Sequence, residues 1–199
     1  MKYINLAINI IYSLIIKRKF KRCYKIYIDR TCRISGYKYI NIGNQLVVGK
    51  MLRMEAIDKY GKQKMEPKIT IGDRVFINDY VHIGCVTEIR IGSNVVLGSN
   101  ITIIDHNHGI YNKNSEQKIS HPSTPINERE LSLGQKIVIG DNVWIGDGAR
   151  ILPGVTIGKN SVIAANAVIT KDIPQESLVG GNPARILKKW CEVKKDWLR

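Results

Sequence analysis

Aliphatic residues return at every sixth position over much of this chain, usually followed by glycine or a small polar residue. They are Ile71, Ile77, Ile83, Ile91, Leu97 and Ile103, and then every sixth residue from Ile139 to Ile169. The spacing slips by two residues between Ile83 and Ile91. A second inward position, often smaller, lies four residues after each aliphatic one. β-Branched residues suit short strands, and the Gly, Asn, Asp and Ser residues between them supply the backbone angles of tight corners.

A period of six residues fits one short strand and a corner, and it is too short for a helix and a turn. One such strand cannot bury its apolar face alone, so consecutive units must stack into a solenoid with an aliphatic interior. The pattern therefore predicts an all-β repeat protein. At 199 residues, the chain is long enough for one domain with a sizeable core.

The net charge of the chain is +14, which is typical of proteins that meet nucleic acid, membranes or phosphate-rich ligands. Nucleic acid is disfavoured, because the sequence has no helix-turn-helix, zinc-finger or RNA-binding signature and its basic residues concentrate at the two ends. The cysteines show no spacing typical of a metal site or a disulfide framework, and they are Cys23, Cys32, Cys85 and Cys191. We interpret them as free thiols in a reducing cytoplasm.

The N-terminal residues 3–16 form an apolar run, and a basic stretch follows at 17–22. The run is shorter than the roughly 20 residues that cross a bilayer. No small-residue cleavage site is evident and the positive charge follows the run, which disfavours a secretory signal. We expect a helix that packs on one end of the solenoid and covers its open strand edge. The alternative is an interfacial anchor whose basic flank contacts anionic lipid.

The C-terminal residues 185–199 are basic and carry a stripe of apolar side chains, at Ile186, Leu187, Trp190, Val193, Trp197 and Leu198. The stripe predicts a short basic helix that packs on the last coil. The segment from Gly181 to Arg185 is predicted to be the turn that leads into this helix. That turn would place a helix N-terminus where an anion can bind.

The six-residue period stops after Ile103 and resumes at Ile137 or Ile139. The polar interval between them is long for a loop in a compact domain, and such loops are usually functional or disordered. It opens with Asp105-His106-Asn107-His108-Gly109. An alcohol is a poor nucleophile while it keeps its proton, and histidine can remove that proton near neutral pH and pass it on. This segment is therefore the candidate for general-base chemistry.

Several motifs in a fixed order carry a resemblance to a known family. They are Ile104–Gly109, Ile139–Gly146 with its Trp144, Val155–Gly158, Thr170–Pro174 and Gly181–Arg185. The chain resembles the hexapeptide-repeat acyltransferases, and among them the maltose and galactoside acetyltransferase branch. Within that branch, it is most similar to the O-acetyltransferases of bacterial surface polysaccharide pathways. The resemblance is strong over residues 69–188 and weak over 34–68.

The resemblance implies a left-handed parallel β-helix with three sides and about 18 residues in each coil. We expect an N-terminal apolar and basic helical segment at 1–30. The β-helix acyltransferase domain would occupy 31–176, with a protruding loop at 104–136, and a C-terminal turn and basic helix would follow at 177–199. The resemblance also implies a homotrimer with active sites between subunits.

The resemblance also assigns catalytic and acceptor-binding residues. The family's catalytic histidine falls on His106, with His108 as the runner-up, and Asn78 matches an asparagine that contacts the reacting centre. Relatives in the galactoside branch contact the sugar through an acidic residue at the place of Val86, and this chain has its Glu88 two positions later. A galactoside or maltose acceptor is therefore not expected. The candidate acceptor-binding residues are Glu88, His108 and Trp144.

The implied donor is acetyl-CoA, with no metal. Backbone amides suit the amide groups of its pantetheine arm, and basic side chains suit its phosphates. The resemblance places Trp144 and Gly146 near the thioester and Asp147 and Ala165 along the arm. Asp147 replaces a serine that is common in close relatives. The residues expected near the nucleotide end are Thr170, Lys171, Arg185 and Lys188.

The implied activity is acetyl transfer to a sugar hydroxyl in the biosynthesis of a cell-surface polysaccharide, such as an O-antigen, capsule or exopolysaccharide. The hydroxyl would attack the thioester directly, without an acyl-enzyme on Cys85. We expect a cytoplasmic enzyme with a free or lipid-linked sugar acceptor, at the inner face of the membrane if the N-terminus contacts lipid. N-acetyl transfer to an amino-sugar nucleotide is the alternative. A γ-class carbonic anhydrase, with His82 and His106 as metal ligands, is less favoured. Its third histidine would be His108, only two residues on, where that family places it several residues later.

Overall fold

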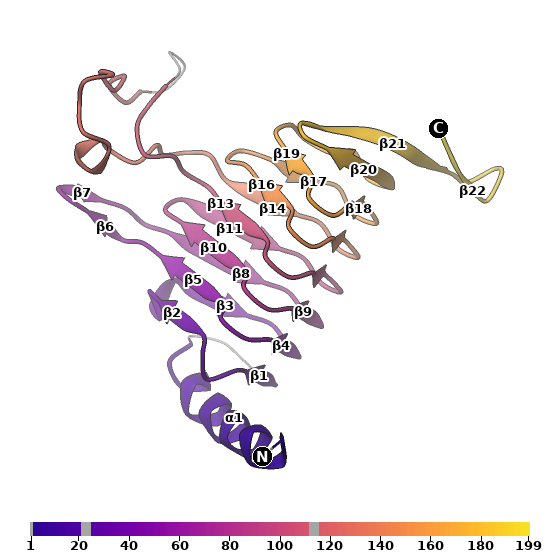
Figure 1. Cartoon of the computed structure of the whole chain (residues 1–199), viewed down its shortest axis with the longest axis horizontal. Helices are drawn as coiled ribbons and strands as arrows, with labels where there is room; N and C mark the ends of the chain where they lie inside the picture. The colour runs from indigo at the N-terminus through magenta and orange to yellow at the C-terminus, as the bar shows by residue number, and fades with distance from the viewer. Residues whose placement is uncertain (1, 21–24, 112–115) are drawn as a thin grey trace.

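The computed structural model describes residues 2–20, 25–111 and 116–199. Its strands form the three faces of a solenoid, and most of their pairings are parallel (Figure 1). The nine-stranded sheet contains, in spatial order, β1 (Ile26–Ile28), β4 (Leu46–Val48), β9 (Val75–Ile77), β12 (Val96–Leu97), β15 (Trp144–Ile145), β18 (Val162–Ile163), β20 (Ser177–Gly181), β21 (Ala184–Cys191) and β22 (Asp196–Leu198). Cys23, the basic residues Lys21 and Arg22, and residues 112–115 of the predicted loop lie outside the described residues.

Two shorter sheets complete the solenoid. The six-stranded sheet contains β19 (Val168–Ile169), β16 (Arg150–Ile151), β13 (Thr102–Ile104), β10 (His82–Cys85), β5 (Arg53–Ala56) and β2 (Arg33–Ser35). The five-stranded sheet contains β17 (Thr156–Ile157), β14 (Ile137–Ile139), β11 (Glu88–Ile91), β8 (Lys68–Ile71) and β3 (Ile40–Ile42). Outside these sheets lie a hairpin of β6 (Lys59–Tyr60) and β7 (Gln63–Lys64) and the 3-10 turns η1 (Tyr37–Tyr39) and η2 (Ile126–Glu128).

Each coil stacks its strands directly on those of the coil before it. Ile145 pairs with Ile163, which lies 18 positions later, so a regular coil has the expected length. The aliphatic residues of the six-residue period point inward and are buried, as Ile83 and Ile103 illustrate. The predicted all-β solenoid with an aliphatic interior is confirmed.

The two-residue slip of the period lengthens one coil. Ile83 pairs with Ile103, which lies 20 positions later rather than 18. The extra residues fall between β10 and β11, where Val86 and Thr87 form the corner. Their backbone N–H groups turn toward the start of the predicted loop, where they take part in the candidate site.

Polar residues at the corners hold neighbouring coils together. The Oδ1 atom of Asp73 accepts a hydrogen bond from the backbone N–H of Asn44 at 2.7 Å, and Asp141 does the same for Ser93 at 2.7 Å. Asparagines at other corners adopt the left-handed backbone conformation, and they are Asn94, Asn100, Asn142, Asn160 and Asn166. These side chains build the scaffold.

Helix α1 (Lys2–Lys17) covers the N-terminal end of the solenoid, as predicted (Figure 1). The Ser13 hydroxyl accepts a hydrogen bond from the N–H of Ile28 at 2.8 Å, and the Asn9 amide donates to Asp29 at 2.7 Å. Ile16, on the inner side of the helix, is buried in the core of the solenoid. The helix therefore satisfies polar groups that the first strand would otherwise leave unpaired. Among the described residues, no helix is both long and apolar enough to cross a bilayer.

The C-terminal segment is a β-hairpin, so the prediction of a basic helix was wrong. β20 pairs antiparallel with β21, and β21 pairs antiparallel with β22. The turn after Gly181 therefore leads into a strand, and this described segment offers no helix N-terminus to an anion. The hairpin extends away from the solenoid (Figure 1), with Trp190 and Trp197 facing each other at 5.8 Å between ring centroids. Pairing with the open edge of β20 satisfies backbone groups of β21, which outweighed the helical spacing of its apolar residues.

The predicted protruding loop is present between the end of β13 at Ile104 and the start of β14 at Ile137 (Figure 1). Its two stems pair with each other. The N–H of Gly109 donates to the carbonyl of Glu130 at 2.8 Å, and the N–H of Ser132 donates to that of Asn107 at 3.0 Å. This pairing holds the start of the loop, with its two histidines, against the solenoid.

Candidate active site

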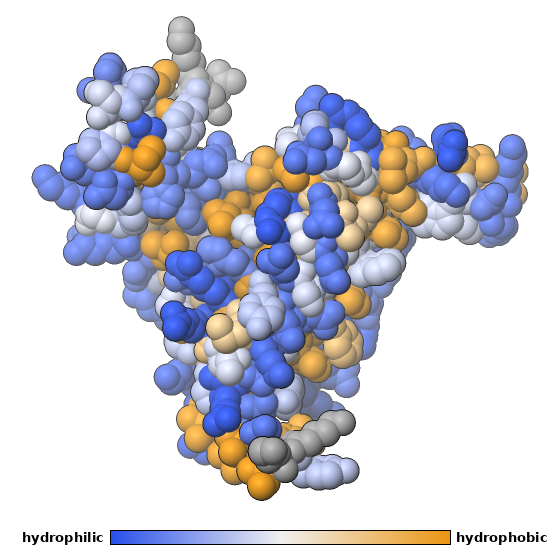
Figure 2. Space-filling view, viewed as in Figure 1, coloured by the Kyte–Doolittle hydropathy of each residue, from blue (hydrophilic) through white to orange (hydrophobic). Residues whose placement is uncertain are grey.

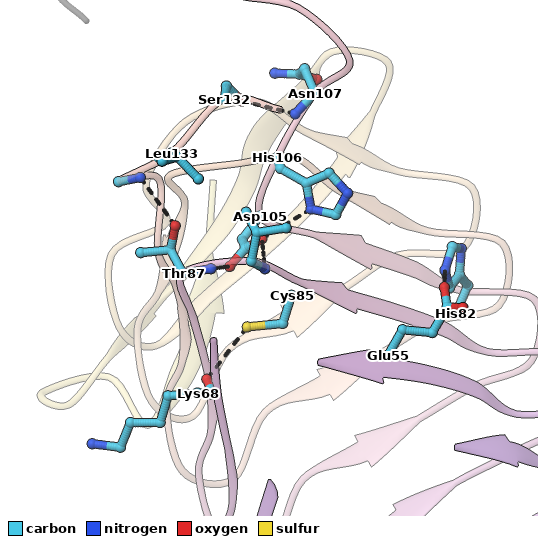
Figure 3. A network of polar contacts seen from close by, with 12 residues as sticks. Glu55, Lys68, His82, Cys85, Thr87, Asp105, His106, Asn107, Ser132 and Leu133 are labelled. Atoms are coloured by element: carbon cyan, nitrogen blue, oxygen red, sulfur yellow. Dashed lines mark hydrogen bonds and ion pairs between the residues drawn. The ribbon is translucent and has the colours of Figure 1, made fainter. Parts of the chain in front are cut away.

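An aspartate–histidine pair lies where the loop leaves β13. Asp105 is fully buried, and its carboxylate accepts hydrogen bonds from the backbone N–H of Val86 at 2.8 Å and of Thr87 at 2.9 Å. The Nδ1 atom of His106 lies 3.1 Å from Oδ1 of the same carboxylate (Figure 3). The slip in the period thus supplies the two amides that fix the carboxylate, and the carboxylate fixes the imidazole.

This geometry defines the tautomer of a neutral His106 ring, that is, which ring nitrogen carries the proton. A carboxylate without a proton only accepts hydrogen bonds, so Nδ1 of His106 carries the proton of the neutral ring. Its Nε2 atom is left with a free lone pair. The side chain is only 9 % exposed, so packing as well as the hydrogen bond restricts its rotation. A neutral imidazole held in this way can act as a general base.

The second histidine of the segment, His108, stands on the outer side of the pair. It is exposed, and its Nδ1 atom lies 3.2 Å from the hydroxyl of Tyr60. The Tyr60 hydroxyl donates its proton to the carbonyl of Asn127 at 3.1 Å, so His108 is the donor to Tyr60. The rings of His106 and His108 are 6.5 Å apart between centroids. Both imidazoles therefore reach the same region, and His106 is the more firmly held.

The β6–β7 hairpin fastens the loop over this region. Gln63 forms two hydrogen bonds with the backbone of Leu131, one donated by its Nε2 at 3.1 Å and one accepted by its Oε1 at 2.7 Å. Thr87 accepts a hydrogen bond from the N–H of Gly134 at 3.1 Å. These contacts hold the second stem of the loop, and the hydrogen bonds of Asp105 to Val86 and Thr87 hold the first.

The predicted catalytic and acceptor-binding residues are not all brought together. Glu88 lies on β11 in the five-stranded sheet, where it forms ion pairs with Arg90 at 2.8 Å and Lys68 at 3.8 Å. The Arg90 hydrogen bond is the main reason why the pKa of Glu88 is lowered. Asn78 is exposed at the corner after β9, on the nine-stranded sheet. Within one chain, neither residue contacts His106.

The predicted donor-binding residues follow the C-terminal coils. Trp144 projects from β15 and is 55 % exposed. Gly146 lies against the next coil, because a Cβ there would come within 2.7 Å of the Ala165 backbone nitrogen. The carboxylate of Asp147 accepts the N–H of Ser99 at 2.7 Å, as the other corner aspartates do. Gly146 and Asp147 thus have structural roles that do not depend on a ligand.

The remaining predicted donor-binding residues are all on the surface. Ala165 and Thr170 follow β18 and β19, and Lys171 is the next residue. Arg185 and Lys188 lie on β21 of the hairpin, where both side chains are exposed. They lie at different corners of the C-terminal coils and on the hairpin, well separated in the chain from the aspartate–histidine pair.

The Cys85 thiol is unsuited to nucleophilic catalysis. Its side chain is buried next to the site, and its sulfur donates to the carbonyl of Lys68 at 3.5 Å (Figure 3). Desolvation by burial raises the pKa of the thiol far above its ordinary value. Among the described residues, no three His, Cys, Asp or Glu side chains converge to form a metal site.

The sequence reasoning quoted Asp105 within its motif but gave it no role, and it missed Tyr60 altogether. One signal for Asp105 was available, since an acidic residue directly before a candidate histidine is well placed to orient it. The other part of its environment consists of the backbone N–H groups of Val86 and Thr87. Their position next to Asp105 can be known only once β10 is paired with β13. Tyr60 lies 48 positions from His108 and carries no signal in the sequence.

Comparisons with known proteins agree with this picture. The family model described as bacterial transferase hexapeptide (six repeats) matches residues 136–171. The chain is 34 % identical over 190 residues to WbbJ of Escherichia coli (strain K12), named as a lipopolysaccharide biosynthesis O-acetyl transferase. That match covers 96 % of this chain and 91 % of WbbJ.

Two solved structures are also similar. A maltose O-acetyltransferase from Clostridium difficile 630 is 29 % identical with a TM-score of 0.55, over 84 % of this chain and 67 % of that one. The hexapeptide-repeat acetyltransferase VCA0836 of Vibrio cholerae O1 biovar eltor, solved with acetyl coenzyme A, is 28 % identical with a TM-score of 0.54, over 95 % and 82 %. These likenesses bear out the left-handed winding that the sequence resemblance implied. The chain belongs to the hexapeptide-repeat acyltransferases, among the relatives of the bacterial polysaccharide O-acetyltransferases.

Proposed function

We propose that the protein is an acetyl-CoA-dependent O-acetyltransferase that acetylates a sugar hydroxyl during the biosynthesis of a cell-surface polysaccharide. The observation that carries this proposal is the Asp105–His106 pair, which leaves a histidine lone pair at the mouth of the loop. WbbJ, the relative that the chain matches along most of its length, supports the substrate class. The sugar acceptor is free or linked to a lipid.

The proposed reaction needs only this pair and the two substrates. His106 Nε2 removes the proton from the acceptor hydroxyl while the hydroxyl oxygen attacks the thioester carbonyl carbon. The carbon–sulfur bond of the tetrahedral intermediate then breaks. The proton held by His106 passes to the departing thiolate, which leaves as coenzyme A, and the acetyl ester remains on the sugar. Asp105 stabilises the positively charged imidazole between these two steps.

The donor is proposed to lie along the C-terminal coils of a neighbouring subunit. Trp144 would lie near the thioester, Asn78 near the reacting centre, and Lys171, Arg185 and Lys188 near the nucleotide phosphates. Two observations support this placement. These side chains are exposed in the single chain, and three of them are cationic, as phosphate binding requires.

We infer a homotrimer from an apolar column on the outer face of the nine-stranded sheet. Its members are stacked by strand pairing, and they are Val47, Phe76, Val96 and Trp144. All four are exposed in the single chain, which is unusual for a continuous row of large apolar side chains. A neighbouring subunit that covers this column would also bring its His106 close to Trp144.

The trimer predicts that Phe76→Asp shifts the protein toward a monomer in sedimentation velocity. A charge in the middle of a buried apolar contact is costly, so we expect the association constant to fall about tenfold or more. Val193→Asp is the control, because Val193 is 93 % exposed at the tip of the C-terminal hairpin. A wild-type protein that sediments as an active monomer would contradict the trimer.

The N-terminal helix supports a location at the inner face of the membrane. Its outer side presents a continuous apolar surface, which consists of Tyr3, Ile4, Leu6, Ile8, Ile10, Ile11, Leu14 and Ile15. Figure 2 shows this surface at the N-terminal tip of the molecule. The helix has no acidic residue, and Lys17, Arg18 and Lys19 follow at its end. An apolar face with a basic flank fits a cytoplasmic protein that docks on anionic lipid.

Membrane docking predicts that the protein co-sediments with vesicles containing phosphatidylglycerol and only weakly with pure phosphatidylcholine. Ile11→Asp and Leu14→Asp should each reduce this binding about tenfold or more, because burying one such side chain is worth roughly 1.5–3 kcal/mol. Val193→Asp is the matched control on another exposed apolar site. Equal binding by all variants would contradict docking, and loss of the trimer would show that the helix contacts another subunit instead.

The activity itself is tested with labelled acetyl-CoA and a panel of acceptors. The panel contains methyl glycosides, an amino-sugar nucleotide and a sugar on a polyprenyl diphosphate. We expect label in an ester, which mild alkali removes. Label that resists alkali would indicate an amide and therefore the alternative, N-acetyl transfer. Transfer to amines but to no hydroxyl would contradict the proposed function.

A further inference from the structure

A second imidazole lies next to His106 on the outer face of the six-stranded sheet. His82 on β10 pairs with Arg53 on β5, and Gly84 pairs with Glu55. The Nε2 atom of His82 lies 3.3 Å from Oε2 of Glu55, which also forms an ion pair with Nε of Arg53 at 2.7 Å. Figure 3 shows Glu55 and His82 on the side to which the His106 ring points. The proposed mechanism gives it no role.

Gly84 separates the two imidazoles, and the fold does not account for a glycine there. Its backbone is outside the left-handed region, unlike that of seven of the chain's other glycines. At most of the other glycines that lie outside the left-handed region, a Cβ would come within 3.0 Å of an atom of another coil, as it would at Gly98. At Gly84 a Cβ would lie 3.4 Å from the His106 Cε1 and 3.6 Å from the His82 Nε2, which are ordinary contacts. An alanine would fit, so the missing methyl group leaves room between the two rings.

The Glu55 group can bind a sugar hydroxyl. Burial is the main reason why the pKa of His82 is lowered, so its ring is neutral at pH 7, and its Nε2–H donates to the Glu55 carboxylate. Both described contacts of Glu55 use Oε2, which leaves Oε1 as an acceptor. The side chains of Glu55 and His82 are 26 % and 29 % exposed, so a ligand can reach them. The Arg53 guanidinium adds donors at the same place.

We propose that Glu55, His82 and Arg53 form an acceptor subsite that binds the hydroxyl next to the one that is acetylated. The inference rests on the proposed function. With the reacting hydroxyl at His106 Nε2, the neighbouring hydroxyl of the same ring lies on the side of Gly84 and can donate to Glu55. The enzyme would then select sugars that carry a free hydroxyl beside the acetylated position, because a carboxylate oxygen that the bound sugar covers without a partner is costly.

The test uses the methyl glycoside that the wild-type enzyme acetylates best, together with its monodeoxy analogues. Glu55→Gln should lower kcat/KM for the full sugar about 10- to 100-fold and leave the KM for acetyl-CoA unchanged. For the analogue that lacks the neighbouring hydroxyl, the same substitution should have little effect. Gly84→Ala should raise the KM for the sugar in a protein that melts at the wild-type temperature.

The control is Glu66→Gln, an exposed glutamate before β8 that should leave both substrates unaffected. Equal losses for the sugar and its deoxy analogue would overturn the subsite, because they would indicate a structural role of Glu55. Unchanged kinetics in Glu55→Gln would overturn it as well. A wild-type enzyme that acetylates no hydroxyl is a separate result, and it would contradict the proposed function.

Discussion

Replacing His106 with asparagine is expected to lower kcat about 10²- to 10⁴-fold, because the acceptor hydroxyl then keeps its proton as it approaches the thioester. Asparagine is close to histidine in size and can still hydrogen bond to Asp105, so the fold and the KM for acetyl-CoA should change little. The measurement is steady-state kinetics of the variant and the wild-type enzyme with labelled acetyl-CoA and the best acceptor of the panel. Thermal unfolding of the same samples reports whether the variant is folded.

His108→Asn is the matched comparison for this experiment. His108 is exposed and donates to Tyr60, so its Nε2 atom also has a lone pair and geometry alone does not remove it as a rival. We expect the His108 variant to lose less than about tenfold in kcat, with its main effect on the KM of the acceptor. If the His108 variant loses more activity than the His106 variant, the two roles must be exchanged.

The sequence predicted the solenoid well because one physical requirement repeats along it. Every sixth residue must fill the interior, and Ile83 and Ile103 satisfy that requirement in the same register. The loop was equally predictable, since it is the place where the requirement lapses. Neither conclusion needed knowledge of which strands pair.

The C-terminal hairpin could not be predicted from the same kind of pattern. Ile186, Leu187 and Trp190 fit a helical stripe, and the alternation of β21 is no clearer than that stripe. What decides the structure is the open edge of β20, which accepts β21 as its antiparallel partner. That edge exists only once the coils have stacked, so residues 185–199 alone do not reveal it.

The site shows the same division between local and long-range information. His106 was found because it lies in a short motif at the end of a strand. Glu55 and His82 are next to it only because β5, β10 and β13 are neighbours in one sheet. The predicted donor residues lie on other coils, and a cleft between subunits would be needed to join them to His106.

Asp105→Asn is expected to lower kcat by a similar factor, about 10²- to 10⁴-fold, although Asp105 does not touch the substrate. An asparagine has one acceptor oxygen and one donor group in place of two acceptor oxygens. The Val86 and Thr87 amides and His106 Nδ1 together need both oxygens of the carboxylate. Oδ1 serves Val86 and His106, and Oδ2 serves Thr87. If the new oxygen keeps the Thr87 amide, the NH2 group faces His106 and favours the tautomer with the proton on Nε2, where the base must be free.

The same substitution should also lower the free energy of unfolding, by about 1–3 kcal/mol, because one buried N–H group loses its acceptor. Asp73→Asn is the matched control, since Asp73 is a corner aspartate that accepts a single backbone N–H, that of Asn44. Its remaining oxygen can keep that bond, so activity and stability should stay near wild type. The activity is measured at temperatures where the Asp105→Asn variant is fully folded. A loss of kcat there shows that Asp105 orients His106, because instability cannot explain it. If activity falls only in proportion to the unfolded fraction, Asp105 supports the corner and does not orient the base.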